Sequence, residues 1–272
     1  MERESMEVDV VIVGAGPSGL ATACRLGQIA QESGQELSVV VVEKGSEVGA
    51  HILSGAVFEP RALNELFPNW KELGAPLNTE VGGDEIFYFT GAEKGSKVPN
   101  PFVPKTMHNE GNYVISLGNL CRWLAEQAEG LGIEVFPGFA ATEVLYNEDG
   151  SVKGIATGDS GIDHNGEKKP SYTPGMELHA KYTVFSEGCR GHLGKGLMEK
   201  FNLREGVDPQ HYGLGNRSGQ ASAGPGGAHR RLAAERIRLP RRWLPVPHGR
   251  QPGDPGSDHR PGLFQPARFT LR

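Results

Sequence analysis

The stretch VDVVIVGAGPSGLATACRL, residues 8–26, is the most informative part of the sequence about the architecture. Its first part, Val8–Val13, is β-branched apart from Asp9 and predicts a strand that is buried on both faces. Pro17 suits the first turn of a helix, where its missing N–H costs no hydrogen bond, and Leu20–Gly27 continues the helix. The sequence between them therefore connects a buried strand to a helix through a glycine-rich turn.

Six residues of that turn form the G-x-G-x-x-G fingerprint of dinucleotide-binding proteins. They are Gly14, Ala15, Gly16, Pro17, Ser18 and Gly19. Gly14 permits the tight turn, Gly16 lets backbone N–H groups approach a pyrophosphate, and Gly19 lets the helix pack closely on the strand. Because the positive end of the helix dipole follows directly, we expect the phosphates of the ligand to lie there.

The stretch LSVVVVEKG, residues 37–45, predicts a second buried strand that ends at Glu43, and the polar stretch Gln31–Gln35 predicts the loop that leads to it. A carboxylate at this point accepts the ribose hydroxyls of an adenosine and repels a 2′-phosphate, which disfavours NADP. FAD and NAD remain. A second glycine-rich loop, Ser186–His192, follows a later strand, and by analogy with flavoprotein domains it favours FAD.

The rest of the well-patterned sequence alternates between helical and strand periods. Ser116 is expected to cap a helix with an apolar stripe of Leu117, Leu120, Leu124, Ala128 and Leu131. Strands are expected at IEVFPG (133–138), TEVLYN (142–147), VKGIAT (152–157) and ELHAKYTVFSEG (177–188), with a hairpin turn at Asp149-Gly150. We predict an α/β fold: an incomplete Rossmann-like FAD-binding domain of the glutathione-reductase or aromatic-hydroxylase type with an inserted β-meander.

The composition changes abruptly near Gly215. Residues 1–215 hold 17 basic and 30 acidic residues, a net charge of −13, whereas residues 216–272 hold 11 arginines, no lysine and 3 acidic residues, a net charge of +8. The later segment also has 8 prolines and 8 glycines and no helical or strand period. We predict a partial FAD-binding domain over 1–215 and a disordered tail over 216–272, read out of frame after a frameshift. A genuine basic tail that binds nucleic acid or anionic lipid nonspecifically is the alternative.

The chain has three cysteines, Cys24, Cys121 and Cys189, which are too far apart for a metal knuckle or a disulfide framework. A reducing compartment is the simplest interpretation. No apolar run reaches membrane-spanning length, and the acidic start MERESMEVDV is typical of neither a signal nor a transit peptide. The protein is expected to stay in the cytoplasm or to attach to a membrane surface without crossing it.

Four stretches together resemble the electron transfer flavoprotein-ubiquinone oxidoreductase family. The likeness runs from about Val8 to Gly215 and ends where the composition changes. It is carried by VIVGAGPSGL (11–20), VEKGSEVGAHILSGAVFEPRALNELFPNWKELGAPLNT (42–79), GNYVISLGNLCRWLAEQAEGLGIEVFPGFAATEVLYNEDGSVKGIATGD (111–159) and GMELHAKYTVFSEGCRGHLGKGLMEKFNL (175–203).

The resemblance implies a flavoenzyme with FAD and a [4Fe–4S] cluster, which accepts electrons from reduced electron transfer flavoprotein and passes them to ubiquinone. It implies a peripheral position on the cytoplasmic face of a bacterial inner membrane. The fingerprint Gly14–Gly19 and Glu43 would hold the FAD, with Lys44, the loop His51–Gly55 and Gly188 near it. Since electron transfer needs no acid, base or nucleophile, no catalytic side chain is expected.

In this family the stretch that matches Gly49–Trp70 is expected to dip into the membrane interface. The candidate membrane contacts are its apolar and aromatic residues Ile52, Leu53, Val57, Phe58, Leu63, Leu66, Phe67 and Trp70. Periodicity alone is equally consistent with an ordinary buried helix and loop. The resemblance to the family favours membrane contact for this stretch.

The chain also departs from the family. The cluster needs four cysteines near the carboxyl end, and this chain has none after Cys189, so no metal site is expected. The segments expected to line the ubiquinone pocket and to complete the flavin domain also lie beyond Gly215 in the family. For the polypeptide as written we therefore favour a non-catalytic nucleotide-binding remnant. A FAD-dependent monooxygenase or prenyl reductase is the enzymatic alternative, and specific nucleic-acid binding by the tail ranks last.

Overall fold

A computed structural model describes residues 3–52, 55–90, 94–163 and 165–208. Contacts between residues divide the chain into two units. Among the described residues, the first consists of residues up to Thr79 and of Tyr113–Val207, and the second consists of Glu80–Asn112 with Asp208. The predicted boundary at Gly215 and the predicted tail over 216–272 lie outside the described residues.

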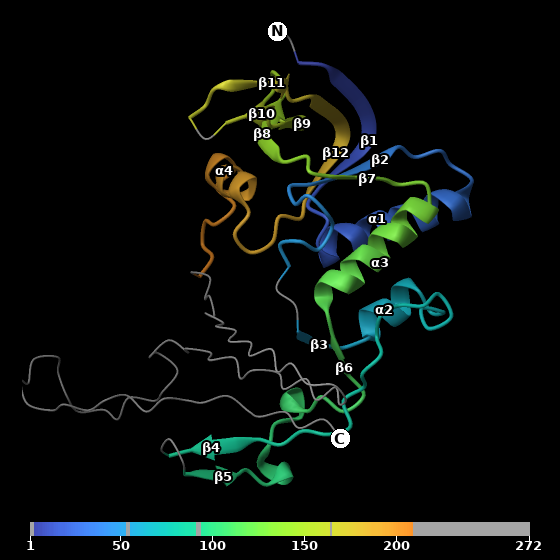
Figure 1. Cartoon of the computed structure of the whole chain (residues 1–272), viewed down its shortest axis with the longest axis vertical. Helices are drawn as coiled ribbons and strands as arrows, with labels where there is room; N and C mark the ends of the chain where they lie inside the picture. The colour runs from blue at the N-terminus through green and yellow to red at the C-terminus, as the bar shows by residue number, and fades with distance from the viewer. Residues whose placement is uncertain (1–2, 53–54, 91–93, 164, 209–272) are drawn as a thin grey trace, which may run out of the picture. The chain divides into compact units, whose positions relative to one another are not determined.

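The first unit is built on a six-stranded sheet (Figure 1). In sheet order its strands are β7 (Glu134–Pro137), β2 (Val39–Glu43), β1 (Ser5–Val13), β12 (Glu177–Phe185), β9 (Val152–Thr157) and β8 (Ala141–Tyr146). The first four are parallel, and β9 runs antiparallel to both β12 and β8. This mixed α/β sheet confirms the predicted Rossmann-like class with an antiparallel meander.

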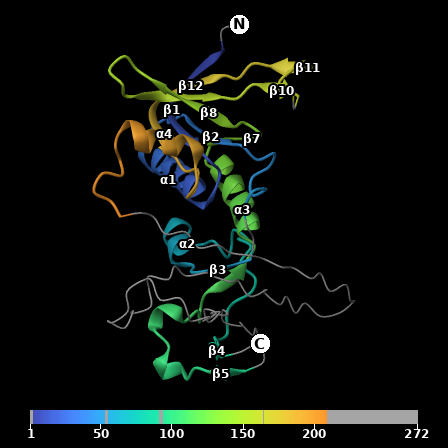
Figure 2. The same ribbon diagram turned by 90° about the vertical axis from the view of Figure 1, so that its left-hand side faces the viewer.

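Side chains of β1 and β2 alternate between two apolar cores. Helices α1 (Pro17–Ser33) and α3 (Leu117–Gly130) lie side by side on one face of the sheet, as Figures 1 and 2 show. On the opposite face, β1 and β2 pack with apolar side chains of the antiparallel strands and of α4 (His192–Lys200). The prediction that the first strand is buried on both faces is confirmed.

The first helix is longer than the sequence pattern predicted. Gln31–Gln35 was expected to form a loop, but α1 continues to Ser33. It ends where Gly34 adopts a left-handed conformation with φ +63°, and Gln35 N donates to Ala30 O at 3.0 Å. The polar residues lie on the exposed face of the last turn, so their polarity marked a surface and not the end of the helix.

The helix predicted after Ser116 is confirmed, including its cap, because Ser116 Oγ accepts a hydrogen bond from Asn119 N at 3.4 Å. The predicted hairpin at Asp149-Gly150 is also confirmed. Gly150 has φ +82°, and Asp149 Oδ1 accepts from Ser151 N at 2.9 Å.

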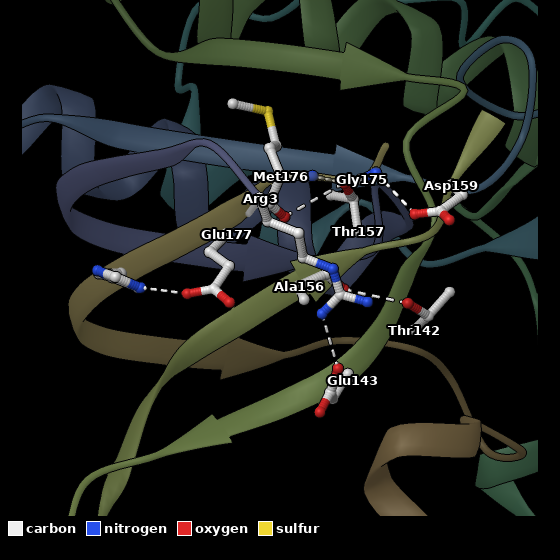
Figure 3. Close-up of polar contacts among 10 residues, drawn as sticks. Arg3, Thr142, Glu143, Ala156, Thr157, Asp159, Gly175, Met176 and Glu177 are labelled. Carbon is white, nitrogen blue, oxygen red and sulfur yellow. Dashed lines mark hydrogen bonds and ion pairs between the residues drawn. The ribbon is translucent and has the colours of Figure 1, made fainter. Parts of the chain in front are cut away.

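Polar contacts fasten the meander to its neighbours (Figure 3). Asp159 Oδ1 accepts from Gly175 N at 2.8 Å, and Arg3 Nη1 pairs with Glu143 Oε2 at 2.9 Å. The connection between β9 and β12 forms a separate hairpin of β10 (Ser160–Ile162) and β11 (Lys168–Thr173).

The segment predicted to contact the membrane contributes partly to the core of the first unit. It contains β3 (Ala56–Phe58), which pairs with β6 (Tyr113–Ile115), and the short helix α2 (Arg61–Leu66). Phe67 and Trp70 are only 7% and 5% exposed. Their rings meet those of Trp123 and Tyr113 edge to face, with centroids 5.4 and 5.7 Å apart.

The rings of Phe67 and Trp70, both predicted as membrane contacts, are therefore covered by the core of the first unit. Leu63 is buried as well, and Ile52, Phe58 and Leu66 are partly buried against the same core. Val57 is half-buried on β3, and Leu53 lies outside the described residues.

The segment Glu80–Asn112 of the second unit is a small insertion between two parts of the first unit, and the sequence did not predict its short elements. It contains the antiparallel strands β4 (Phe87–Phe89) and β5 (Gly95–Lys97), followed by the 3₁₀ helices η1 (Asn100–Phe102) and η2 (Lys105–Met107). The Asp84 carboxylate accepts hydrogen bonds from the backbone and side-chain amides of Asn109 and so joins the beginning of this segment to its end.

Burial should protect two of the three thiols from modification. Cys24 on α1 donates to Leu124 O on α3 at 3.4 Å, and burial raises the pKa of Cys24 and of Cys121 to about 12. Since the thiolate is the reactive form, we expect iodoacetamide at pH 8 to modify only the exposed Cys189 in the folded protein and all three cysteines in denaturant. Mass spectrometry of the native and denatured reactions measures this, with Cys189→Ser as the control. Native modification of Cys24 or Cys121 as fast as that of Cys189 would contradict the packing.

Candidate dinucleotide-binding site

The carboxyl ends of three parallel strands meet at the centre of the sheet. The chain passes from β1 through α1 to β2 on one side of β1, whereas β12 pairs with β1 on the other side. The end of β1 is therefore the point where the strand order reverses, and open α/β sheets bind ligands in the crevice at such a point. The turn after β1, the end of β2 and the loop after β12 supply its residues.

The three fingerprint glycines have different surroundings. Gly14 has φ +104°, and a Cβ there would lie 2.6 Å from Ser186 O. A Cβ at Gly19 would lie 2.0 Å from Gly14 O, so α1 packs against the turn at backbone distance. A Cβ at Gly16 would meet no atom within 4 Å. Gly14 and Gly19 are thus required by the fold, while Gly16 faces open space that a ligand can approach.

Glu43 ties the end of β2 to the glycine turn. Its Oε2 accepts from Ala15 N at 2.9 Å, and its Oε1 accepts from Gly45 N at 2.7 Å. Gly14 N also donates to Val42 O at 2.8 Å. A carboxylate can accept about four hydrogen bonds, so the two backbone donors leave acceptor sites for a ligand. The fold therefore joins Glu43 directly to the fingerprint turn.

His51 lies on the same side of Gly45 as Glu43. The point that a Cβ would occupy at Gly45 is 3.1 Å from Glu43 Oε1 and 3.5 Å from His51 Nδ1. The structure thus brings His51 to the site. Lys44, the residue after Glu43, has an exposed side chain. Pro17 and Ser18 at the start of α1 are exposed as well.

The first turn of α1 carries the electrostatics of the site. Gly16 is its N-cap, and in the described part of the chain no side chain caps this end and no acidic residue lies in the first turn. The first N–H groups of α1 therefore have no side-chain cap, and they lie at the positive end of the helix dipole. A phosphate group would satisfy both.

The second glycine loop lies beside the first. Ser186 N donates to Val13 O at 2.8 Å, and Gly188 has φ +78° with open space on its Cβ side. Sequence reasoning missed the role of Glu187, whose carboxylate accepts from Leu193 N and Gly194 N at the start of α4. The N-cap residue of α4 is Gly191, which has no side chain that could cap the helix. This glycine was the signal that another residue must supply the cap.

The described residues contain no group of three or more His, Cys, Asp or Glu side chains that could hold a metal ion. Likewise, none of the helices in the described ranges is long and apolar enough to cross a bilayer.

The comparisons with known proteins agree with this geometry. Residues 12–70 match the model of the NAD(P)-binding Rossmann-like domain. Over 216 residues, 79% of this chain, the sequence is 72% identical to electron transfer flavoprotein-ubiquinone oxidoreductase of Pseudomonas aeruginosa. Over the same length it is 54% identical to the mitochondrial protein of that name from Homo sapiens. The matches fall in the amino-terminal part of those proteins.

The chain is homologous to the amino-terminal part of the electron transfer flavoprotein-ubiquinone oxidoreductases. The predicted resemblance is thereby confirmed. The chain spans about two fifths of the length of the bacterial relatives, with 39% of the Pseudomonas protein covered and 38% of a probable oxidoreductase of this name from Acinetobacter baylyi.

Solved structures resemble the chain more distantly. A geranylgeranyl bacteriochlorophyll reductase-like protein from Thermoplasma acidophilum is 21% identical with a TM-score of 0.46, over 66% of this chain and 39% of that one. A flavoprotein/dehydrogenase from Cytophaga hutchinsonii is 18% identical with a TM-score of 0.45, over 79% of this chain and 44% of that one.

The surroundings of the glycines predict different losses of stability for two alanine substitutions. Gly19→Ala should lower the free energy of unfolding by about 1–3 kcal/mol, because its Cβ has no room between α1 and the turn. Gly16→Ala should change it by roughly 0.5 kcal/mol or less, since the new methyl group meets nothing. Urea unfolding of both variants measures the difference, and equal stability of the two would show that the turn is not packed as described.

Proposed function

We propose that this chain binds FAD through the turn Gly14–Gly19, and that the complete protein transfers electrons from reduced electron transfer flavoprotein to ubiquinone. The observation that carries the proposal is the convergence of the glycine turn and Glu43 at the switch point of the sheet, held by the bond from Ala15 N to Glu43 Oε2. Relatives named for this reaction, which match the chain at 54–72% identity, support the reaction class.

The residues present fit an adenine dinucleotide. The open space beside Gly16 and the uncapped first turn of α1 suit a pyrophosphate, and the free acceptor sites of Glu43 suit ribose hydroxyls. The negative charge of Glu43 opposes a 2′-phosphate, so NADP fits poorly. His51 lies near Gly45 and Glu43, and Gly188 follows the residues that lie against Gly14. We propose both as further contacts of the dinucleotide.

When bound, the flavin supplies the ability to accept two electrons and to release them singly. The side chains of this chain hold and orient it. Glu43 fixes the ribose end, the first turn of α1 neutralises the phosphates, and the loop that contains Gly188 limits movement beside Gly14. None of these roles requires a proton transfer.

The cysteines of this chain do not fit a [4Fe–4S] cluster, which takes four thiolates. Cys24 and Cys121 are fully buried on α1 and α3, and their raised pKa keeps them protonated. Cys189 is the third and last cysteine in the sequence. The proposal for this chain therefore includes no iron–sulfur cluster.

FAD binding should depend on the open space at Gly16. We expect the purified chain to bind FAD in preference to NAD and NADP, and Gly16→Val to weaken FAD binding by roughly tenfold or more. The valine side chain would fill the space that the pyrophosphate needs, and each charge-assisted hydrogen bond lost costs about 1.5–3 kcal/mol. Quenching of flavin fluorescence on titration measures the affinity.

Gly82→Val is the matched control, because a Cβ at Gly82 also meets nothing within 4 Å and Gly82 lies in the second unit. Preferential binding of NAD, or equal FAD affinity of the Gly16→Val variant and wild type, would refute the assignment.

The reaction assigned to the complete protein is tested separately. A full-length relative that carries the sequence of this chain as its amino-terminal part should reduce a quinone analogue only when reduced electron transfer flavoprotein is supplied. Oxygen consumption driven by NADPH would instead favour the alternative, a FAD-dependent monooxygenase.

We also propose that a membrane surface is contacted by the second unit. Large apolar side chains are exposed there on three elements: Tyr88 on β4, Phe102 on η1 and Met107 on η2, with Phe102 79% exposed. Exposed aromatic and apolar side chains suit the interface of a bilayer.

Binding to vesicles tests this surface. We expect the chain to sediment with phosphatidylglycerol-containing vesicles, and Phe102→Ser to weaken that binding by about tenfold, since burying a phenylalanine side chain is worth about 1.5–3 kcal/mol. Tyr182→Ser is the control, because Tyr182 on β12 is 74% exposed but belongs to the first unit. Equal losses for both variants, or no binding by wild type, would refute the proposal.

A further inference from the structure

The loop between β12 and α4 contains a carboxylate that caps a helix from an unusual distance. The N-cap residue of α4 is Gly191, which has no side chain to satisfy the first N–H groups of the helix. Glu187, four residues earlier, supplies the acceptors. Its Oε1 accepts from Leu193 N at 3.2 Å and its Oε2 accepts from Gly194 N at 2.8 Å. The carboxylate therefore lies at the positive end of α4, where its charge is favoured.

Glu187 is held tightly in this place. Its side chain is only 11% exposed, and His192 Nδ1 lies 3.3 Å from Oε1. A Cβ at Gly191 would lie 2.4 Å from the Cβ of Glu187, so only glycine allows the backbone to pass at that distance. The loop Gly188–Gly191 therefore folds closely around the Glu187 side chain. Within it, Gly191 N donates a hydrogen bond to Gly188 O at 3.3 Å.

The backbone beside the same residue contacts the glycine turn. A Cβ at Gly14 would lie 2.6 Å from Ser186 O and 3.5 Å from Glu187 N. Ser186 N donates to Val13 O at 2.8 Å, immediately before the turn. Glu187 thus connects two structures: its side chain holds the start of α4, and its backbone lies against the turn that begins the fingerprint.

We infer that Glu187 is a positioning residue of the dinucleotide site. It fixes the loop Gly188–Gly191 beside Gly14 without touching the ligand itself, so that the two glycine-rich segments keep one spacing. This inference rests on the proposed function, because it assigns the loop to the binding of the dinucleotide. A residue that only stabilised α4 would affect the stability of the fold and leave the glycine turn unchanged.

The test compares Glu187→Ala with Asp159→Ala. Asp159 is a matched control because its carboxylate also accepts a backbone N–H, that of Gly175 at 2.8 Å, but it lies on the meander among the contacts that Figure 3 shows. We expect Glu187→Ala to weaken FAD binding by at least tenfold and Asp159→Ala to change it by less than twofold. Glu187→Gln, which keeps one acceptor oxygen, should restore part of the lost affinity.

Hydrogen exchange of the ligand-free protein gives a second readout. The amides of Gly14 and Ala15 donate to Val42 O and to Glu43 Oε2, so their exchange reports the order of the turn. In Glu187→Ala they should exchange at least tenfold faster than in wild type, and in Asp159→Ala at the wild-type rate. Thermal unfolding shows how much stability each variant has lost.

The outcomes separate the two proposals. If both variants lose stability equally while FAD affinity and exchange of the turn stay at wild-type values, Glu187 only caps α4 and the inference is overturned. If wild type itself binds no FAD, the proposed function fails. In that case the exchange measurement still decides whether Glu187 orders the glycine turn.

Discussion

The structure depends on the close approach of three backbone segments at the end of β1. The turn at Gly14 lies against Ser186, α1 lies against the turn at Gly19, and Glu43 bonds to Ala15 from the neighbouring strand. A side chain at Gly14 or Gly19 would push these segments apart, because the space is already filled by main-chain atoms. Two glycines therefore set the geometry of the sheet centre, and the third leaves the crevice open. The same few atoms serve both folding and ligand access.

The sequence predicted best those elements whose formation depends on residues close together in the chain. A β-branched run before a glycine turn, a serine before an apolar helical stripe and an Asp-Gly pair between two strands each act within a few residues of one another, and β1, α3 and the hairpin between β8 and β9 formed as expected. The end of α1 was harder. The polar residues before Gly34 cover an exposed helical turn, and composition does not distinguish such a turn from a loop.

The features that the sequence did not reveal depend on residues far away along the chain. Phe67 and Trp70 have the apolar and aromatic character that a membrane interface prefers, but Trp123 and Tyr113, more than forty residues away in sequence, cover them. Glu187 was missed for the same reason, since its capping role depends on how the loop folds back and not on the usual position before a helix. A pattern of apolar residues states that a side chain avoids water; it does not state what covers it.

The contacts of Glu43 fix its carboxylate relative to the glycine turn. A carboxylate at the edge of a sheet would ordinarily be solvated, and its position would be variable. Here each oxygen accepts one backbone N–H, from Ala15 and from Gly45, so folding fixes the carboxylate and the glycine turn together. A ligand that adds hydroxyl donors to the remaining lone pairs would join a contact that is already ordered, and the entropy of ordering these groups is lost on folding and not on binding. The second glycine loop extends this reasoning, because Glu187 orders it through α4 in the same way.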